Sequence, residues 1–234
     1  MKPTVYEIDD MLNIVRDLIP FGIQKAIKFS DGYNSFCEKA DKHLKENHIV
    51  ISCGATKICL IPEESDWVIK LSFDMTGDFD PEEEEVDFCR REAYNYQRAV
   101  DQGLEEYFAA TYKVGKVEDI DVYVQQKVET DSDKIDGMFS SYVENVYEDS
   151  LVDYTGDEYR WEVEDYVLDL EDTERIEAVF GASDATCKLA IFIEKYEIND
   201  LHCANYGFVN GVPVIMDYSG YKVPSLKGED DEED

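Results

Sequence analysis

The sequence has little of what metal sites, secretion or membrane insertion require. It contains only three histidines in 234 residues, and its six cysteines include no CxxC pair, so no zinc site is expected. The amino-terminal MKPTVYEIDDML lacks the apolar run of a signal peptide. No stretch approaches the roughly 18 apolar residues of a membrane span. We therefore expect a cytoplasmic protein with reduced thiols and no membrane contact. The cysteines are Cys37, Cys53, Cys59, Cys89, Cys187 and Cys203.

Basic residues are scarce as well. The chain has 22 lysines and arginines against 55 acids, which gives a formal net charge of −33. Such a surface repels nucleic acid and anionic membranes, so direct nucleic-acid binding is not expected. It favours basic partners, such as a basic protein or an enzyme that itself binds nucleic acid. The same acids are also explained as a charged surface that keeps the protein soluble, and both interpretations stay open.

The chain has enough apolar side chain to fold. Hydrophobic residues make up 44% and aromatic residues 12% of the sequence, which is too much for a disordered acidic chain. Its length suits one large domain or two small lobes.

Apolar spacing predicts how the chain is organised. Residues 5–48 are predicted to be helical, in one segment ended by Pro20 and another from Gly32 to Glu46. Strands are predicted at 48–53, 57–61, 67–73, 111–114 and 122–128. A helix at 86–102, ended by Gly103, follows an acidic loop at 74–87 that contains the run Glu82 to Glu85. The result is an α+β fold with a five-stranded antiparallel sheet and one helix after its third strand.

The second half of the chain has a different pattern. Residues 130–197 are predicted to be mainly helical, and 198–221 hold two short apolar runs joined by Asn210-Gly211, a strong hairpin signal. Residues 228–234 form an acidic tail, which is predicted to be disordered.

Three polar residues flank that hairpin at a chemically useful spacing. Asp200 is followed five residues later by Asn205, and Asp217 comes after the second apolar run. Magnesium prefers hard oxygen ligands and takes few from protein. A carboxylate and an amide carbonyl joined by a hairpin can meet at one ion, and a third carboxylate can orient a nucleophile. Aspartate and asparagine are also common turn residues, which is the alternative explanation.

Here the sequence resembles the eukaryotic-like protein kinase superfamily. Asn199-Asp200-Leu201-His202-Cys203-Ala204-Asn205, the hairpin and Met216-Asp217-Tyr218-Ser219-Gly220 are similar to its catalytic loop and DFG-like motif, and an Asp-Leu-His run is common in its aminoglycoside-phosphotransferase branch. The resemblance implies that Asp200 accepts or orients the proton of the substrate hydroxyl. It also implies that Asn205 and Asp217 hold Mg²⁺ against the phosphates of ATP.

The first half of the chain resembles the same family in a second motif. Trp67-Val68-Ile69-Lys70 is similar to the run that places a lysine on the third strand, and Arg90-Arg91-Glu92 lies in the helix that follows. The resemblance implies that Lys70 pairs with the nucleotide phosphates and that Glu92 holds Lys70. A solvent-facing lysine and one more acid in an acid-rich helix are the alternative.

The loop that covers the phosphates departs from the family pattern. Of the three glycines in G-x-G-x-x-G only the middle one, Gly54, remains, and Ser52 and Lys57 occupy the other two places. Glycines at these positions let backbone N–H groups approach phosphate. Their loss is expected to weaken the binding of the nucleotide phosphates by this loop. The resemblance still implies nucleotide contacts at Ser52 and Gly54, and adenine contacts at a hinge formed by Gln126, Lys127 and Val128.

The resemblance covers residues 48–221 and implies a two-lobed kinase-like fold. We expect a helical extension at 1–47, an N-lobe at 48–129, a small, mainly helical C-lobe at 130–227 and the tail at 228–234. The C-lobe has no room for an activation segment or for the large helices that bind protein substrates.

Three functional hypotheses follow. The first is an ATP- and Mg²⁺-binding phosphotransferase that moves the γ-phosphate to a hydroxyl acceptor. The second is a catalytically weak or inactive kinase-like protein, a pseudokinase, whose acidic surface sequesters or inhibits a basic or nucleic-acid-binding partner. The third is that the family match is accidental and the chain is an acidic α+β domain.

Overall fold

The computed structural model describes residues 2–28, 32–73, 87–199 and 201–220. These residues divide into two units. The sheet unit comprises 2–98 and 110–127, and the helical unit comprises 99–109 and 128–220. Residues 2–47, the expected extension, thus belong with the sheet, and 99–109 belong with the later helices. The acidic loop at 74–86 and the tail at 228–234 lie outside the described residues.

The sheet unit begins with three helices, α1 (Val5–Leu18), α2 (Ile23–Lys28) and α3 (Gly32–Glu46). Thr4 starts α1 with a capping box, in which its hydroxyl accepts the Glu7 N–H and the Glu7 carboxylate accepts the Thr4 N–H. Pro20 lies in a short 3-10 helix, η1 (Ile19–Phe21), which ends at Gly22 with a φ of 94°. The helical prediction for this region is confirmed, and the left-handed residue adds a break that separates α2.

The sheet contains β1 (Ile49–Cys53), β2 (Lys57–Pro62), β3 (Trp67–Ser72), β4 (Thr111–Val117) and β5 (Ile120–Gln126), all antiparallel, in the order β1-β2-β3-β5-β4. The predicted α+β class and five-stranded antiparallel sheet are confirmed. Helix α4 (Phe88–Gln102) follows β3, and Gly103 ends it with a φ of 69°. Strand β5 ends two residues before its predicted end, and β4 runs three residues further than predicted.

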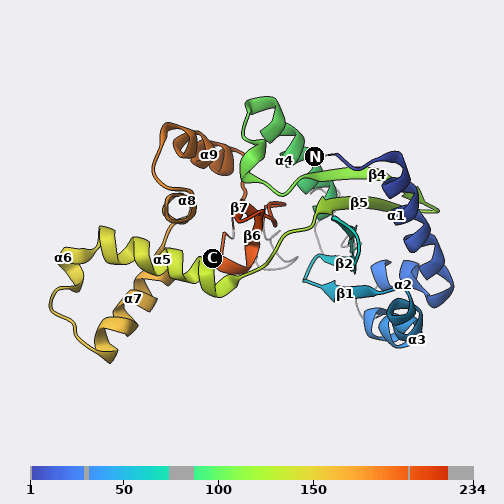
Figure 1. Cartoon of the computed structure of the whole chain (residues 1–234), viewed down its shortest axis with the longest axis horizontal. Coiled ribbons are helices and arrows are strands. Elements are labelled where there is room, and N and C mark those ends of the chain that lie inside the picture. The colour runs from blue at the N-terminus through green and yellow to red at the C-terminus, as the bar shows by residue number, and fades with distance from the viewer. Residues whose placement is uncertain (1, 29–31, 74–86, 200, 221–234) are drawn as a thin grey trace, which may run out of the picture. The chain divides into compact units, whose positions relative to one another are not determined.

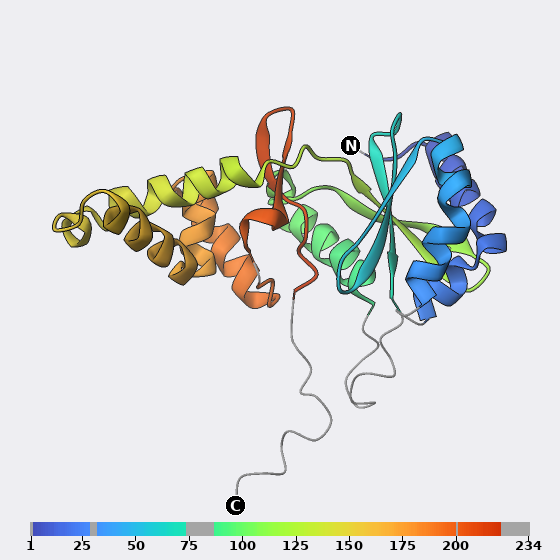
Figure 2. The ribbon, with the colours of Figure 1, turned by 90° about the horizontal axis from the view of Figure 1, so that it is seen from below.

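The strand pairing sorts side chains onto two faces of the sheet. Leu60, Ile69 and Val124 are fully buried and lie opposite one another across three strands, so they share one face. Helix α1 contacts β4 on that face, where the side chain of Leu12 lies against Gly115. Cys59, Lys70 and Tyr123 share the other face. Figure 2 shows α1–α3 on one side of the sheet and the start of α4 on the other.

The helical unit contains η2 (Glu105–Tyr107), α5 (Ser132–Val146), α6 (Glu148–Leu151), α7 (Asp157–Asp169), α8 (Asp172–Phe180), α9 (Asp184–Lys195) and η3 (Cys203–Asn205), and the hairpin of β6 (Tyr206–Val209) with β7 (Val212–Ile215) (Figure 1). Helix α5 packs against α7 and α8. Asn210 and Gly211 have φ angles of 52° and 80°, as the tight turn of the predicted hairpin requires. Buried aromatic side chains of Phe139 and Tyr206 meet at the core with centroids 6.0 Å apart.

Candidate functional site

A buried ion pair joins β3 to α4 in the sheet unit. Lys70 Nζ lies 2.9 Å from Glu92 Oε2. Glu92 is completely buried and Lys70 is 6% exposed. The structure therefore brings together the two residues that the family resemblance assigned to one ion pair, on the face of the sheet that α4 covers.

A second lysine binds the same carboxylate. Lys57 Nζ donates to Glu92 Oε1 at 2.5 Å, and Lys57 is 5% exposed. Lys57 pairs with Ser72 across the β2–β3 ladder, and Cys59 pairs with Lys70, so both lysines lie on one face as diagonal neighbours. Each oxygen of the Glu92 carboxylate thus accepts from one lysine. Sequence reasoning placed Lys57 only as a substitute for glycine and missed this contact.

Local hydrogen bonds fix the start of α4 over the sheet and so place Glu92. The Phe88 N–H donates to Ser72 Oγ at 3.2 Å. Asp87 accepts the Arg90 N–H at 2.9 Å through one oxygen and the Tyr123 hydroxyl at 2.8 Å through the other. Asp87 is therefore a helix cap that is also tied to the fifth strand.

The thiol of Cys89 lies in the electrostatic field of this cluster. Cys89 is completely buried. Burial raises the pKa of its thiol well above the ordinary value; the charge of Glu92 adds to the rise, and the two lysines oppose it. Cys89 is therefore neutral at physiological pH and acts as an apolar packing group beside the ions.

The β1–β2 turn is an ordinary hairpin turn. Ser52 and Gly54 are exposed, and the Gly54 N–H donates to the Lys57 carbonyl at 3.1 Å. Gly54 does not have a positive φ, and a Cβ built on it would meet nothing within 4 Å. The structure therefore gives no steric reason for glycine at this position.

Two of the three predicted hinge residues, Gln126 and Lys127, use their backbone N–H groups within the protein. The Gln126 N–H donates to the Ala110 carbonyl at 2.8 Å, and the Lys127 N–H donates to the Asp66 carbonyl at 2.7 Å. The Lys127 ammonium also donates to the carbonyls of Pro62 and Glu63, each at 3.1 Å. Lys127 thereby fastens the end of β5 to the β2–β3 turn.

In the helical unit the hairpin brings Asn205 and Asp217 close together. Asn205 ends η3, and its carbonyl accepts the Met216 N–H at 2.9 Å. Both residues are half-buried, and Asp217 Oδ1 accepts the Ser219 hydroxyl at 3.2 Å. One amide and one carboxylate offer the hard oxygens that Mg²⁺ takes from protein, with water completing its shell. The donor chemistry of the pair therefore fits a magnesium ion.

Asp200, the predicted catalytic residue, lies outside the described residues. The next residue, Leu201, is buried and anchored to α8: its N–H donates to Asp172 Oδ1 at 3.4 Å, and its carbonyl accepts from Arg175 at 3.3 Å. His202 then caps η3, because its Nδ1 accepts the Ala204 N–H at 3.2 Å.

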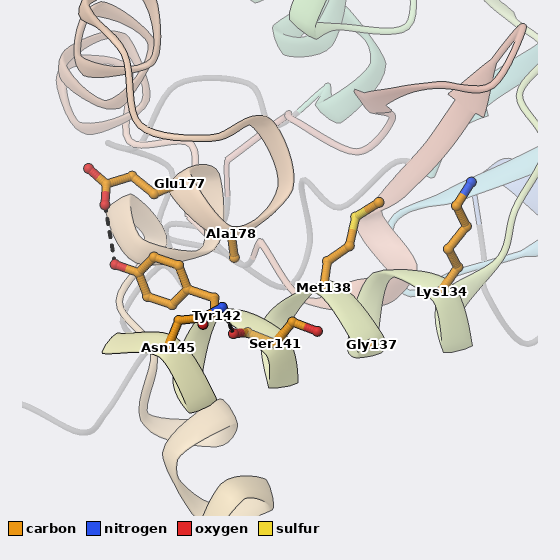
Figure 3. Close-up of a pocket in the computed structure, with 8 residues that line it drawn as sticks. All are labelled: Lys134, Gly137, Met138, Ser141, Tyr142, Asn145, Glu177 and Ala178. Atoms are coloured by element: carbon orange, nitrogen blue, oxygen red, sulfur yellow. Dashed lines mark hydrogen bonds between the residues drawn. The ribbon is translucent and has the colours of Figure 1, made fainter. Parts of the chain in front are cut away.

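The helical unit also has an open groove between α5 and α8, with a volume of about 370 Å³. Figure 3 shows the Tyr142 hydroxyl on its wall, which donates to Glu177 Oε2 at 3.2 Å. Burial, followed by the charge of Glu177 and this hydrogen bond, raises the pKa of Tyr142 to about 12. Of the predicted site residues that the structure describes, none lines this groove.

Comparisons with known proteins give no match: no family model, no curated protein and no solved structure matches this chain. Across the described ranges, no three or more His, Cys, Asp and Glu side chains gather as a metal site would need. Nor is any helix in that part of the chain both long enough and apolar enough to cross a bilayer. The candidate site therefore depends on the residues of this chain alone.

Proposed function

We propose that the chain is a kinase-like phosphotransferase that binds ATP with Mg²⁺ and moves the γ-phosphate to a hydroxyl acceptor. The observation that carries the proposal is the buried Lys70–Glu92 pair between the third strand and the helix that follows it. A buried ion pair adds little net stability, because desolvation offsets most of its attraction. The buried Lys70–Glu92 pair is therefore better explained as a way of holding the Lys70 ammonium in place for an anionic ligand than as a source of stability.

Each residue of the proposal has a defined task. Glu92 orients the ammonium of Lys70, which binds phosphate oxygens of the nucleotide. Asn205 and Asp217 hold magnesium, which neutralises charge on the phosphates when it is bound. Asp200 takes or orients the proton of the acceptor hydroxyl, whose oxygen forms the new bond to phosphorus as ADP leaves.

A second candidate is a kinase-like protein that binds nucleotide with little transfer. It is favoured by the β1–β2 turn, where the Gly54 N–H already has the Lys57 carbonyl as its acceptor. A phosphate-binding loop needs such N–H groups for the ligand. In this candidate the Lys57 ammonium supplies positive charge for the phosphates, in place of the backbone N–H groups of the loop.

Thermal unfolding with and without Mg-ATP tests the proposal. At a hundredfold excess over the dissociation constant, a ligand stabilises its protein by about 2.7 kcal/mol, which corresponds to a rise in Tm of roughly 5–11 °C for a chain of this size. We expect this rise in the parent and its loss in Lys70→Met and in Asp217→Asn. The matched controls Lys39→Met and Asp9→Asn replace exposed residues of the sheet unit and should keep it.

Phosphate transfer separates the two candidates. Asp200→Asn should keep the Mg-ATP shift and lose ADP formation with a hydroxyl acceptor. A parent that shows the shift but forms no ADP would favour the second candidate. If Lys70→Met and Asp217→Asn bind Mg-ATP as the parent does, the site is wrong.

A further inference from the structure

Helix α7 of the helical unit has one packed face and one exposed face. On the packed face Val163 is 6% exposed, and the ring of Tyr166 stacks on Tyr147 with centroids 4.8 Å apart. Tyr159 donates from the same face to Glu144 at 3.3 Å. The packed face of α7 is therefore covered by α5 and by the segment that follows α5.

The opposite face of α7 carries two large apolar side chains that are mostly exposed. Trp161 is 62% exposed and Leu168 is 75% exposed. They are seven residues apart, which places them two turns apart on the same side of the helix. The only other tryptophan of the chain, Trp67, is 1% exposed. Single exposed apolar residues are ordinary, but a tryptophan and a leucine aligned on one helix face are the kind of side chains that anchor a partner protein.

Acidic side chains surround this pair. The helical spacing places five exposed acids on the same side of α7 as Trp161 and Leu168. The single basic residue of the helix, Arg160, is already paired with Glu164 at 2.9 Å. The five acids are Asp157, Glu158, Glu164, Asp165 and Asp169.

The wider segment is acidic too, and its few bases have partners within the unit. Residues 131–180 contain seventeen acids and three bases. Lys134 lies 3.8 Å from the centre of the Phe208 ring, and Arg175 donates to the carbonyls of Leu168 and Leu170. The field outside α7 is therefore strongly negative.

We propose that this exposed face of α7 docks a basic amphipathic segment of a partner protein. Two apolar side chains of the segment would cover Trp161 and Leu168, while its lysines and arginines would meet the surrounding acids. Charge complementarity selects this occupant, because a second copy of this chain, a nucleic acid or an anionic membrane would bring negative charge to a negative face. The surface uses no residue of the proposed nucleotide site, so either proposal can fail without the other.

The test uses the full-length protein and a fluorescein-labelled peptide that carries leucines seven residues apart with lysines beside them. Its affinity is measured by fluorescence anisotropy at physiological salt. The comparison peptide has the same composition in scrambled order. We expect the patterned peptide to bind more tightly than the scrambled one, and the emission of Trp161 to shift to shorter wavelength as the peptide covers it.

Matched variants separate the surface from the overall charge of the protein. Trp161→Ala with Leu168→Ala keeps every charge, and we expect it to weaken binding by about tenfold or more, as loss of aromatic anchors does. The apolar control is Ile191→Ala, which alters a 64% exposed side chain on α9 and should leave the affinity unchanged. Circular dichroism verifies that each variant is folded.

The charge of the face is tested in the same way. Glu158→Gln with Asp165→Asn should weaken binding more than Asp9→Asn with Asp10→Asn, which removes two exposed acids from α1. The proposal is overturned by any of three results: no detectable binding of the patterned peptide, an affinity of the Trp161→Ala/Leu168→Ala protein within tenfold of the parent, or equal losses from both acid pairs.

Discussion

Replacing Glu92 by glutamine tests the energetics of the buried cluster directly. Glu92 is completely buried and binds the ammonium groups of Lys57 and Lys70, at 2.5 and 2.9 Å. Glutamine keeps the shape but removes the negative charge, and its amide nitrogen would face one of the two cations. Removing one partner from a buried ion pair costs about 3–5 kcal/mol. For a chain of this size that loss lowers Tm by roughly 6–20 °C.

Urea unfolding of Glu92→Gln, with scanning calorimetry for Tm, measures this loss. Glu38→Gln on the exposed side of α3 is the matched control and should stay within about 0.5 kcal/mol of the parent. Lys57→Met alone should cost less than Glu92→Gln, because Lys70 still balances the carboxylate. Added to Glu92→Gln, Lys57→Met should restore stability, with a coupling of about 0.5–3 kcal/mol. A Glu92→Gln protein as stable as the control, or no recovery in the double variant, would refute this reasoning.

Two further predictions concern packing and burial. Gly207→Ala should destabilise the protein by about 1–3 kcal/mol, because the new Cβ would lie 2.6 Å from Val128 Cγ2. Gly137→Ala, in α5 with nothing within 4 Å of the new Cβ, should stabilise it by up to about 1 kcal/mol; thermal unfolding of both variants checks the contrast, and the same sign in both would contradict it. In the native protein iodoacetamide should modify the exposed Cys53 and spare Cys89, which is fully buried and has a raised thiol pKa. Peptide mass mapping checks this before and after unfolding, and labelling of Cys89 in the folded state would contradict it.

The features of the fold that the sequence predicted correctly have local signals. The alternation of apolar residues predicts the five strands, and Asn210-Gly211 predicts the β6–β7 hairpin without knowledge of any distant contact. The contact between Lys70 and Glu92 was expected from a family resemblance rather than from the pattern itself. Their roles toward nucleotide, like those of the other predicted site residues, stay predictions.

The features that were missed depend on register or on tertiary packing. Lys57 reaches Glu92 only because of the β2–β3 pairing, which no local pattern specifies. Val146 continues the helical spacing of the buried Phe139 and Val143, yet it is 53% exposed at the last position of α5. In α7 Val163 and Tyr166 follow helical spacing, and so do Trp161 and Leu168. The sequence pattern alone therefore does not decide which of the two faces is buried, and the structure shows that Val163 is buried and Trp161 exposed.

The shared carboxylate of Glu92 also has a consequence for how the β1–β2–β3 meander finds its pairing. If β2 slipped by one residue, every side chain of the strand would exchange faces. Lys57 would then enter the apolar layer that contains Leu60 and Ile69, and Ile58 would face Glu92. Such a mispaired sheet would bury the Lys57 ammonium among apolar side chains. It would also leave the buried Glu92 carboxylate with one lysine partner instead of two. Together these changes cost several kcal/mol. The buried charges therefore specify the strand register, because they destabilise the shifted pairing of β2 far more than they stabilise the native pairing.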